Sequence, residues 1–228
     1  MVELTTYELS SNVATIALDD GKVNALSLQM LGEINAALDR AESDKAAAVI
    51  LGREGRFSGG FDLNVLRGGG GDGLTMLREG FTLAERLLSF PTPVVIGCTG
   101  HAIAMGAFLL LSADYRIGAA GPFKIQANET AIGLTLPTAA FEITRARLAP
   151  AHFHRALALA EVYAPDDTAI AAGFLDRVVP PADVASESRA TAATLAKLSM
   201  PAHAVNKLKG RDATLKALRA AIEAEFSK

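Results

Sequence analysis

The sequence predicts an α/β fold, and two observations support this class. Short apolar stretches with strand character alternate along the chain with longer stretches of helical periodicity. The 228 residues are 50% hydrophobic, which is ample material for one substantial core. We therefore expect one main unit, residues 1–181, followed by a helical region, residues 182–228.

The first fifty residues are expected to form a hairpin, a helix and a buried strand. Residues 4–9 and 13–18 have β-prone character around a polar turn. Ser27 is a favourable N-cap for a helix whose predicted apolar face is Leu28, Leu31, Ile34 and Leu38. Residues 47–51 are short and apolar, as a buried strand would be.

A glycine-rich segment, residues 68–73, separates the first third of the chain from the next helix. It formally matches the pattern GxGxxG, on which alone a nicotinamide-dependent redox function would rest. No clear strand runs into it and no βαβ unit frames it, so we expect a mobile loop. Helical periodicity then covers residues 74–90 and is stopped by Pro91 and Pro93.

The most apolar stretch, residues 94–111, approaches the length of a membrane span. Gly97, Gly100 and Gly106 interrupt it, so we expect a buried strand, a turn and a buried helix, and no membrane partner. Residues 114–117 are expected to form another strand. Helices are predicted for residues 151–160 and 166–172, and from residue 182 to the end with a break at Pro201.

Composition excludes several classes of partner. A net charge of -3 offers no basic surface for nucleic acid. The single cysteine, Cys98, excludes an intrachain disulfide and offers no cysteine-based metal cluster. The N-terminus has neither a basic leader nor an apolar run, so we expect a cytoplasmic protein. No metal site is expected, because His152 and His154 are too close in sequence to share one helix face.

Three separated stretches are suited to one active site. Residues 56–62 and 100–108 contain tight turns of small residues that can offer backbone N–H groups to a ligand, and residues 128–134 carry a lone carboxylate, Glu129, among apolar neighbours. This combination suits proton transfer next to a carbonyl. The simpler alternatives are an ordinary tight turn at Gly59-Gly60 and a surface or capping role for Glu129.

Four blocks in order and register resemble the crotonase (enoyl-CoA hydratase/isomerase) superfamily over about residues 5–180. They are residues 57–63, residues 93–106, residues 113–117, and Asn128-Glu129 with residues 131–134. The resemblance implies the crotonase fold, a spiral of repeated ββα units with C-terminal helices that build homotrimers or homohexamers and close the coenzyme A site. It also implies an acyl-CoA substrate and no separate cofactor.

The resemblance assigns roles to particular positions. The oxyanion hole, which holds the thioester oxygen, falls on the backbone N–H groups of Gly59 and Met105, and the catalytic acid-base on Glu129. Substrate-pocket positions fall on Phe61, Phe108 and Leu134. The Met105 assignment is physically sensible, since free N–H groups and the helix dipole at a helix start favour negative charge.

One residue departs from the pattern of the hydratases. Family hydratases use two glutamates, and the first aligns with Phe108, which cannot donate a proton. A single glutamate suffices for Δ3,Δ2-enoyl-CoA isomerisation, which we therefore expect. The alternatives are an enoyl-CoA hydratase and a non-catalytic acyl-CoA-binding homologue. Lys207, Lys209 and Arg211 are expected either to meet coenzyme A phosphates or to form a solvated helix face.

Overall fold

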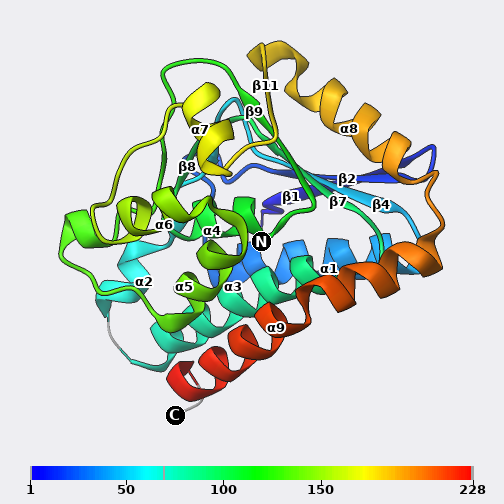
Figure 1. The fold of residues 1–228 in the computed structure, drawn as a ribbon. Coiled ribbons are helices and arrows are strands. Elements are labelled where there is room, and N and C mark those ends of the chain that lie inside the picture. The colour runs from blue at the N-terminus through cyan, green and yellow to red at the C-terminus, as the bar shows by residue number, and fades with distance from the viewer. Residues whose placement is uncertain (1, 69, 227–228) are drawn as a thin grey trace.

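A computed structural model describes residues 2–68 and 70–226, in which strands and helices alternate as predicted (Figure 1). The first part of the chain forms β1 (Thr5–Ser10), β2 (Val13–Leu18), β3 (Ala25–Leu26), α1 (Leu28–Ser43), β4 (Ala47–Leu51), β5 (Gly55–Ser58), β6 (Gly60–Phe61), α2 (Leu63–Gly68) and α3 (Gly71–Ser89). The second part forms β7 (Val94–Cys98), β8 (Gly100–Ile103), α4 (Met105–Ser112), β9 (Tyr115–Ala119), β10 (Ile125–Gln126), the 3₁₀ turn η1 (Thr130–Ile132), α5 (Thr138–Arg147), α6 (Pro150–Leu157), α7 (Asp167–Ala172), β11 (Arg177–Val179), the 3₁₀ turn η2 (Pro181–Asp183), α8 (Val184–Leu195) and α9 (Met200–Phe226). The predicted α/β class is confirmed.

The strands are divided among one large sheet and two small ones. The large sheet has the order β1-β2-β4-β7-β9-β11, and only the β1-β2 pair in it is antiparallel. A small sheet of order β10-β8-β5 is parallel throughout, and β3 pairs with β6. The chain repeatedly passes from a strand of the large sheet to a strand of a small sheet and then to a helix, as in β7-β8-α4. These are the repeated ββα units that the resemblance implies.

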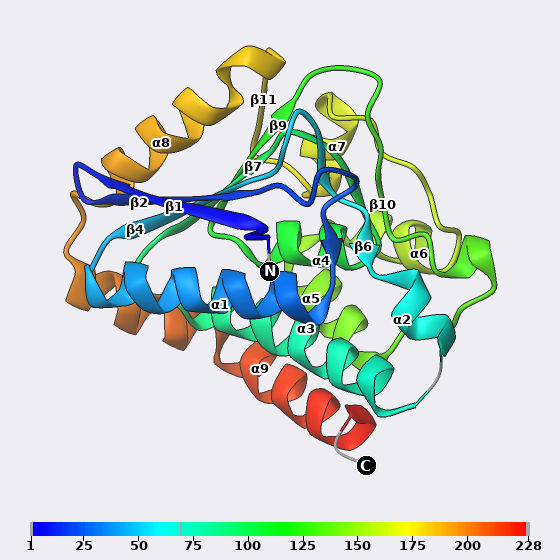
Figure 2. The same cartoon turned by 180° about the vertical axis from the view of Figure 1, so that it is seen from behind.

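The helices cover both faces of the large sheet (Figures 1 and 2). Helices α1, α3 and α4 contribute to the main hydrophobic cluster, in which Leu38, Phe81 and Leu110 are fully buried. Helix α8 packs on the opposite face against β4 and β7, where Val49, Val95 and Ala192 form a smaller cluster. Helix α9 lies outside α3 and α5, so the C-terminal segment is attached to the same chain's core.

Helix α1 follows the prediction except at its first residue. The Ser27 hydroxyl accepts a hydrogen bond from the Met30 amide at 3.2 Å, which confirms the N-cap. Leu31, Ile34 and Leu38 are buried, but Leu28 is 37% exposed, so its placement on the apolar face is wrong. At 3.6 residues per turn, Leu28 points roughly 120° away from the centre of the buried face.

The glycine-rich segment is largely helical rather than a mobile loop. Gly68 is the last residue of α2, and α3 begins at Gly71 instead of at Leu74, while residue 69 lies outside the described residues. Glycine is a poor helix former, but α3 is a 19-residue helix with a long buried face that includes Met76 and Phe81. Burial of that face against the core stabilises the helix as a whole, including its weak first turn.

The apolar stretch from residue 94 to residue 111 forms β7, β8 and most of α4, which confirms the predicted strand and helix, whereas residues 100–103 form a second strand and the turn is confined to Ala104. Every residue of α4 is buried, which explains why the stretch is apolar on all sides. In the described parts of the chain, no helix combines the length and the apolarity needed to cross a bilayer.

The C-terminal helices begin and end near the predicted positions. Asp166 caps α7 by accepting a hydrogen bond from the Thr168 amide at 2.7 Å, and Gly173 ends α7 with a φ of 98°. Helix α8 ends at Leu195 and α9 begins at Met200, so the break predicted at Pro201 is confirmed within one residue.

A buried ion-pair network attaches α9 to the core. The Asp114 carboxylate contacts the Lys207 ammonium at 2.7 Å, the Arg211 guanidinium at 2.8 Å and the Val94 amide at 2.8 Å. Lys207 is only 8% exposed, and burial lowers its pKa to about 8 although Asp114 opposes this shift. Lys207 and Arg211 therefore do not form a solvated helix face and are not free to meet phosphates, because both side chains bind Asp114. Lys209, the third basic residue of this group, is exposed.

We expect Asp114→Ala to destabilise the protein by about 3–5 kcal/mol, because it leaves the buried Lys207 ammonium without its partner. Urea unfolding followed by circular dichroism measures the effect. As a control, Glu223→Ala removes an exposed carboxylate that lies 3.8 Å from Arg78, and should change stability by less than about 1 kcal/mol. Equal effects of the two substitutions would contradict the anchoring role of Asp114.

Candidate active site

The three stretches singled out in the sequence meet at one edge of the small sheet. Strands β5, β8 and β10 are parallel neighbours, so their C-terminal ends lie at the same edge. Gly59 follows β5, Ala104 follows β8, and Asn128-Glu129 follow β10 by two residues. The Ala104 amide donates to the Gln126 carbonyl at 2.8 Å and so joins the second stretch to the third. Ligands of open parallel sheets commonly bind at such an edge.

The first two turns are in direct contact, and this contact requires glycine. Gly60 has a φ of +87°, and a Cβ atom there would lie 2.8 Å from the Ala104 Cβ and 3.3 Å from the Met105 nitrogen. A Cβ atom on Gly106 would lie 2.7 Å from the Ser58 carbonyl oxygen. Any larger residue would force the two turns apart, so these glycines fix the distance between them.

Helix α4 begins at this junction with its first amides uncapped by a side chain. Ala104, the residue before the helix, has a φ of +52°, which is rare for a residue other than glycine. The Met105 amide is at the first helical position, where no acceptor exists within the helix. The start of α4 therefore offers an N–H donor together with the positive end of the helix dipole.

The amides of the first turn are less free than the sequence suggests. The Gly59 amide donates to the Val23 carbonyl at 2.8 Å, and the Gly60 amide donates to the Ser58 hydroxyl at 3.1 Å. Gly59 would have to give up this bond to hold a ligand oxygen. Phe61 follows in β6, and its side chain contributes to the adjacent cavity.

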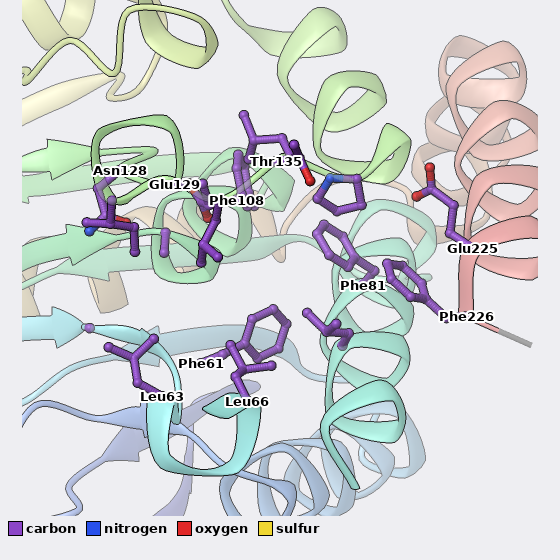
Figure 3. A pocket seen from close by; sticks show the side chains of 17 residues that line it. Phe61, Leu63, Leu66, Phe81, Phe108, Asn128, Glu129, Thr135, Glu225 and Phe226 are labelled. Atoms are coloured by element: carbon purple, nitrogen blue, oxygen red, sulfur yellow. The ribbon is translucent and has the colours of Figure 1, made fainter. Parts of the chain in front are cut away.

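A cavity of about 510 Å³ opens beside these turns (Figure 3). Its size is typical of small-molecule sites. Its lining is mainly apolar and includes Gly59, Glu129 and the three pocket positions taken from the resemblance, Phe61, Phe108 and Leu134. Phe108 is 2% exposed and Leu134 is 47% exposed, so Phe108 belongs to the interior of the cavity and Leu134 to its mouth.

Phenyl rings form a continuous part of the wall. Phe81 of α3 is the central ring, and its centroid lies 6.2 Å from that of Phe61, 6.2 Å from that of Phe108 and 5.6 Å from that of Phe226. Phe108, which the resemblance places at the position of the first hydratase glutamate, is thus packed into an aromatic cluster. A carboxylate there would be desolvated by its neighbours.

Glu129 is the ionisable group at the end of the cavity nearest the turns. Its backbone carbonyl accepts hydrogen bonds from the Ile132 and Leu134 amides at 3.1 and 2.9 Å, which fixes the turn on which it stands. One carboxyl oxygen, Oε2, is buried and has no hydrogen-bond partner among the described residues, and the same holds for the neighbouring Asn128 Oδ1. Two buried acceptors that line the cavity are thus without donors among the described residues.

Burial sets the protonation of Glu129. Desolvation raises the pKa of Glu129 from 4.5 to about 7. No lysine or arginine occurs among the described residues that line the cavity, so no cation opposes this shift there. A carboxyl group with a pKa near 7 can take up and release a proton at neutral pH, which is what an acid-base catalyst requires.

Several lining residues were not found by sequence reasoning. They come from helices α2, α3 and α9 and include Leu63, Leu66, Leu77, Phe81, Glu225 and Phe226. Those of α3 looked like ordinary core positions of an amphipathic helix, and nothing local distinguishes Phe226 near the end of the chain. Within the described ranges, no cluster of three or more His, Cys, Asp or Glu side chains is placed to hold a metal ion.

Comparison with known proteins agrees with this arrangement. Residues 8–227 match the sequence profile of the enoyl-CoA hydratase/isomerase family. An enoyl-CoA isomerase of Mycobacterium tuberculosis is 46% identical, with a TM-score of 0.95 and 100% of both chains covered. An enoyl-CoA hydratase of Mycobacterium ulcerans is 48% identical, with a TM-score of 0.94 over 98% of this chain and 99% of that one. Human mitochondrial Δ3,Δ2-enoyl-CoA isomerase is 27% identical, with a TM-score of 0.92 over 98% and 89%.

The raised pKa of Glu129 predicts a pH-dependent cost to folding. Below about pH 4.5 the carboxyl is protonated in both the folded and the unfolded state and has no effect. Between about pH 4.5 and 7 the carboxyl ionises in the unfolded state but stays protonated in the folded state, so the folded state loses up to about 3 kcal/mol, and the loss is complete above pH 7. We therefore expect Glu129→Gln to stabilise the protein relative to the wild type at pH 8 by about 2–3 kcal/mol more than at pH 4, measured by urea unfolding. The exposed control Glu223→Gln should show no such trend, and a pH-independent difference for Glu129→Gln would contradict its burial.

Proposed function

The chain belongs to the enoyl-CoA hydratase/isomerase family, and we propose that it acts as a Δ3,Δ2-enoyl-CoA isomerase. The proposal rests chiefly on one observation, the Glu129 carboxyl in an apolar cavity, whose Oε2 is buried and has no hydrogen-bond partner among the described residues. Family membership and the crotonase fold make an acyl-CoA thioester the substrate class. The names of the similar proteins include both isomerase and hydratase, so the choice between them depends on the residues of this chain.

In the proposed reaction, Glu129 moves one proton between two carbons of the substrate. Its carboxylate removes a proton from C2 of a 3-enoyl thioester, and the electron pair spreads through the C3–C4 double bond and the thioester carbonyl to form a dienolate. The Glu129 carboxyl then returns the proton to C4, which leaves the double bond between C2 and C3. No atom is gained or lost, so one carboxyl group suffices.

The negative charge of the dienolate would be held by two backbone amides. One is the Met105 amide at the uncapped start of α4, next to the pocket residue Ala104. The other is the Gly59 amide, which would exchange its present acceptor, the Val23 carbonyl, for the thioester oxygen. In other enzymes, a donor of this kind lowers the activation barrier by about 3–4 kcal/mol.

Hydratase activity is the second candidate, since a similar structure carries that name. Hydration of a 2-enoyl thioester needs a water on the double bond and a proton at C2. Phe108 occupies the position of the first acid and packs against Phe81, so Glu129 would have to serve both needs. Losing one acid-base group lowers a rate by about 10²- to 10⁴-fold, which favours isomerisation here.

A non-catalytic acyl-CoA-binding protein is a third candidate. Such a protein would need no acid at position 108, so Phe108 is equally compatible with it. It would also have no use for a buried carboxyl such as that of Glu129, whose burial costs stability. Buried carboxyls with a raised pKa are concentrated at functional sites.

The division of the chain into residues 1–181 and 182–228 is also part of the proposal. Glu225 and Phe226 line the cavity, which supports a role of the C-terminal region in closing the site. Leu198, Val205 and Leu208 are exposed apolar residues at the other end of this region, and they support assembly into a homotrimer or homohexamer.

The reaction type can be tested with two substrates. We expect purified protein to convert 3-enoyl-CoA to the conjugated 2-enoyl-CoA, which absorbs in the ultraviolet, and to hydrate 2-enoyl-CoA far more slowly. Glu129→Gln should lower the first rate by about 10²- to 10⁴-fold, because the glutamine amide is neither a base nor an acid near neutral pH. Binding of a saturated acyl-CoA, measured by calorimetry, should remain.

A control and two contrary outcomes complete this test. Glu223→Gln, a substitution on the exposed side of α9, should leave turnover within about twofold of the wild type. Faster consumption of 2-enoyl-CoA than of 3-enoyl-CoA would identify a hydratase. Binding without turnover of either substrate would support the non-catalytic alternative.

The pKa of Glu129 also predicts the pH dependence of the reaction. The base must be ionised in the free enzyme, so kcat/KM for 3-enoyl-CoA should level off above about pH 7. Below that value it should fall by about tenfold for each pH unit, since the reactive carboxylate becomes protonated. Steady-state rates between pH 5 and pH 9 measure this profile, and a level profile down to pH 5 would argue against Glu129 as the base.

A further inference from the structure

The last turn of α9 is held against the cavity by specific contacts. Both carboxyl oxygens of Glu225 accept from the Thr138 amide, at 3.0 and 2.9 Å, and one also accepts from the Thr138 hydroxyl at 2.6 Å. Thr138 is the first residue of α5, where free amides favour a carboxylate. The next residue, Phe226, is 7% exposed, and its ring stacks on Phe81 at 5.6 Å with an interplanar angle of 7°.

The cavity has two distinct ends. Asn128 and Glu129 lie at one end, and Glu225 and Phe226 lie at the other, with the Phe81 ring beside Phe226 (Figure 3). Glu129 is close to the two turns that would hold a thioester oxygen. The acyl group bound to that thioester must therefore extend away from the turns, along the apolar wall toward Phe226.

We propose that Phe226 is the stop for the acyl chain and sets the maximum length of substrate that the cavity accepts. This inference rests on the proposed function, because it uses the position of the thioester relative to Glu129. The substrate class is then an unbranched acyl-CoA whose chain ends against the stacked pair of Phe226 and Phe81. A longer chain would have to displace a ring that is both stacked and carried by a helix end pinned through Glu225.

The contacts also explain why the stop is firm rather than a loose side chain. Near its start, α9 is anchored by the ion pairs of Lys207 and Arg211 with Asp114, and at its end by Glu225 with Thr138. A helix fixed in its first half and at its last turn cannot easily move away from the cavity. Displacing Phe226 therefore means breaking hydrogen bonds as well as an aromatic contact.

The test is a chain-length series. Wild type, Phe226→Ala and Phe226→Leu are assayed with 3-enoyl-CoA of six, eight, ten, twelve and fourteen carbons. In the wild type, kcat/KM should fall steeply beyond one length. In Phe226→Ala the fall should move to longer chains, and the ratio of kcat/KM for the first rejected chain to that for the last accepted one should rise by about tenfold or more. Phe226→Leu should give a smaller shift in the same direction.

Two further variants distinguish the effect of the Phe226 ring from that of the Glu225 hydrogen bonds and from a general loss of aromatic packing. Glu225→Ala keeps the ring but removes the bonds to Thr138, and it should relax the length limit by less than Phe226→Ala does. Phe153→Ala removes a ring that packs on Phe141, outside the described cavity lining, and should leave the length profile unchanged. Circular dichroism and thermal unfolding confirm that each variant is folded.

Binding of saturated acyl-CoAs of the same lengths, measured by calorimetry, makes the test independent of turnover. If no enoyl-CoA is converted but the affinity profile shifts to longer chains in Phe226→Ala, the acyl stop stands and the proposed isomerase function fails. If the wild type isomerises but Phe226→Ala keeps the same length profile in both turnover and binding, the acyl stop is wrong and the function stands.

Discussion

The parallel alignment of β5, β8 and β10 is the constraint on which the candidate site depends. Because the three strands run side by side in one direction, the residues that follow them emerge at one edge, although they are separated by up to about seventy positions in the chain. Gly60 and Gly106 then allow the first two turns to touch without side chains between them. The Ala104 amide ties the second turn to β10, which carries Glu129. Loss of this alignment would leave three unrelated loops.

The apolar cavity in which we propose an acyl chain to bind also accounts for the raised pKa of Glu129. An apolar lining without a cation leaves the carboxyl desolvated, which raises its pKa toward neutrality and destabilises the folded state at higher pH. Such a cost is characteristic of functional sites, where stability is given up for reactivity. Phe108 contributes to this environment in two ways, since it brings apolar surface and leaves out a second acid.

Helix α9 brings residues 225 and 226 to a cavity whose other lining residues come from positions 59–137. The ion pairs with Asp114 hold α9 near its start, and Glu225 holds its end to α5. Both contacts join residues that are far apart in the sequence. The first gives the buried Lys207 ammonium a partner of opposite charge, and the second gives the free Thr138 amide at the start of α5 an acceptor. The helix therefore has a defined position along α3, and the side chain of Phe226 reaches the cavity wall. Stability of the C-terminal region and the shape of the cavity have the same structural origin.

The sequence by itself determined the fold class, the hairpin, most helix boundaries and the three stretches of the site, because strand and helix periodicity, caps such as Ser27 and breaks such as Pro93 are local signals. It also gave Glu129 as the only carboxylate of those stretches set directly among apolar residues. Only the tertiary structure decided which amides are occupied, that Lys207 is buried on Asp114, and that Phe81 and Phe226 share a wall with Phe108. These features depend on contacts between residues far apart in the chain, and a side chain that packs in a core has the same local pattern as one that faces a cavity.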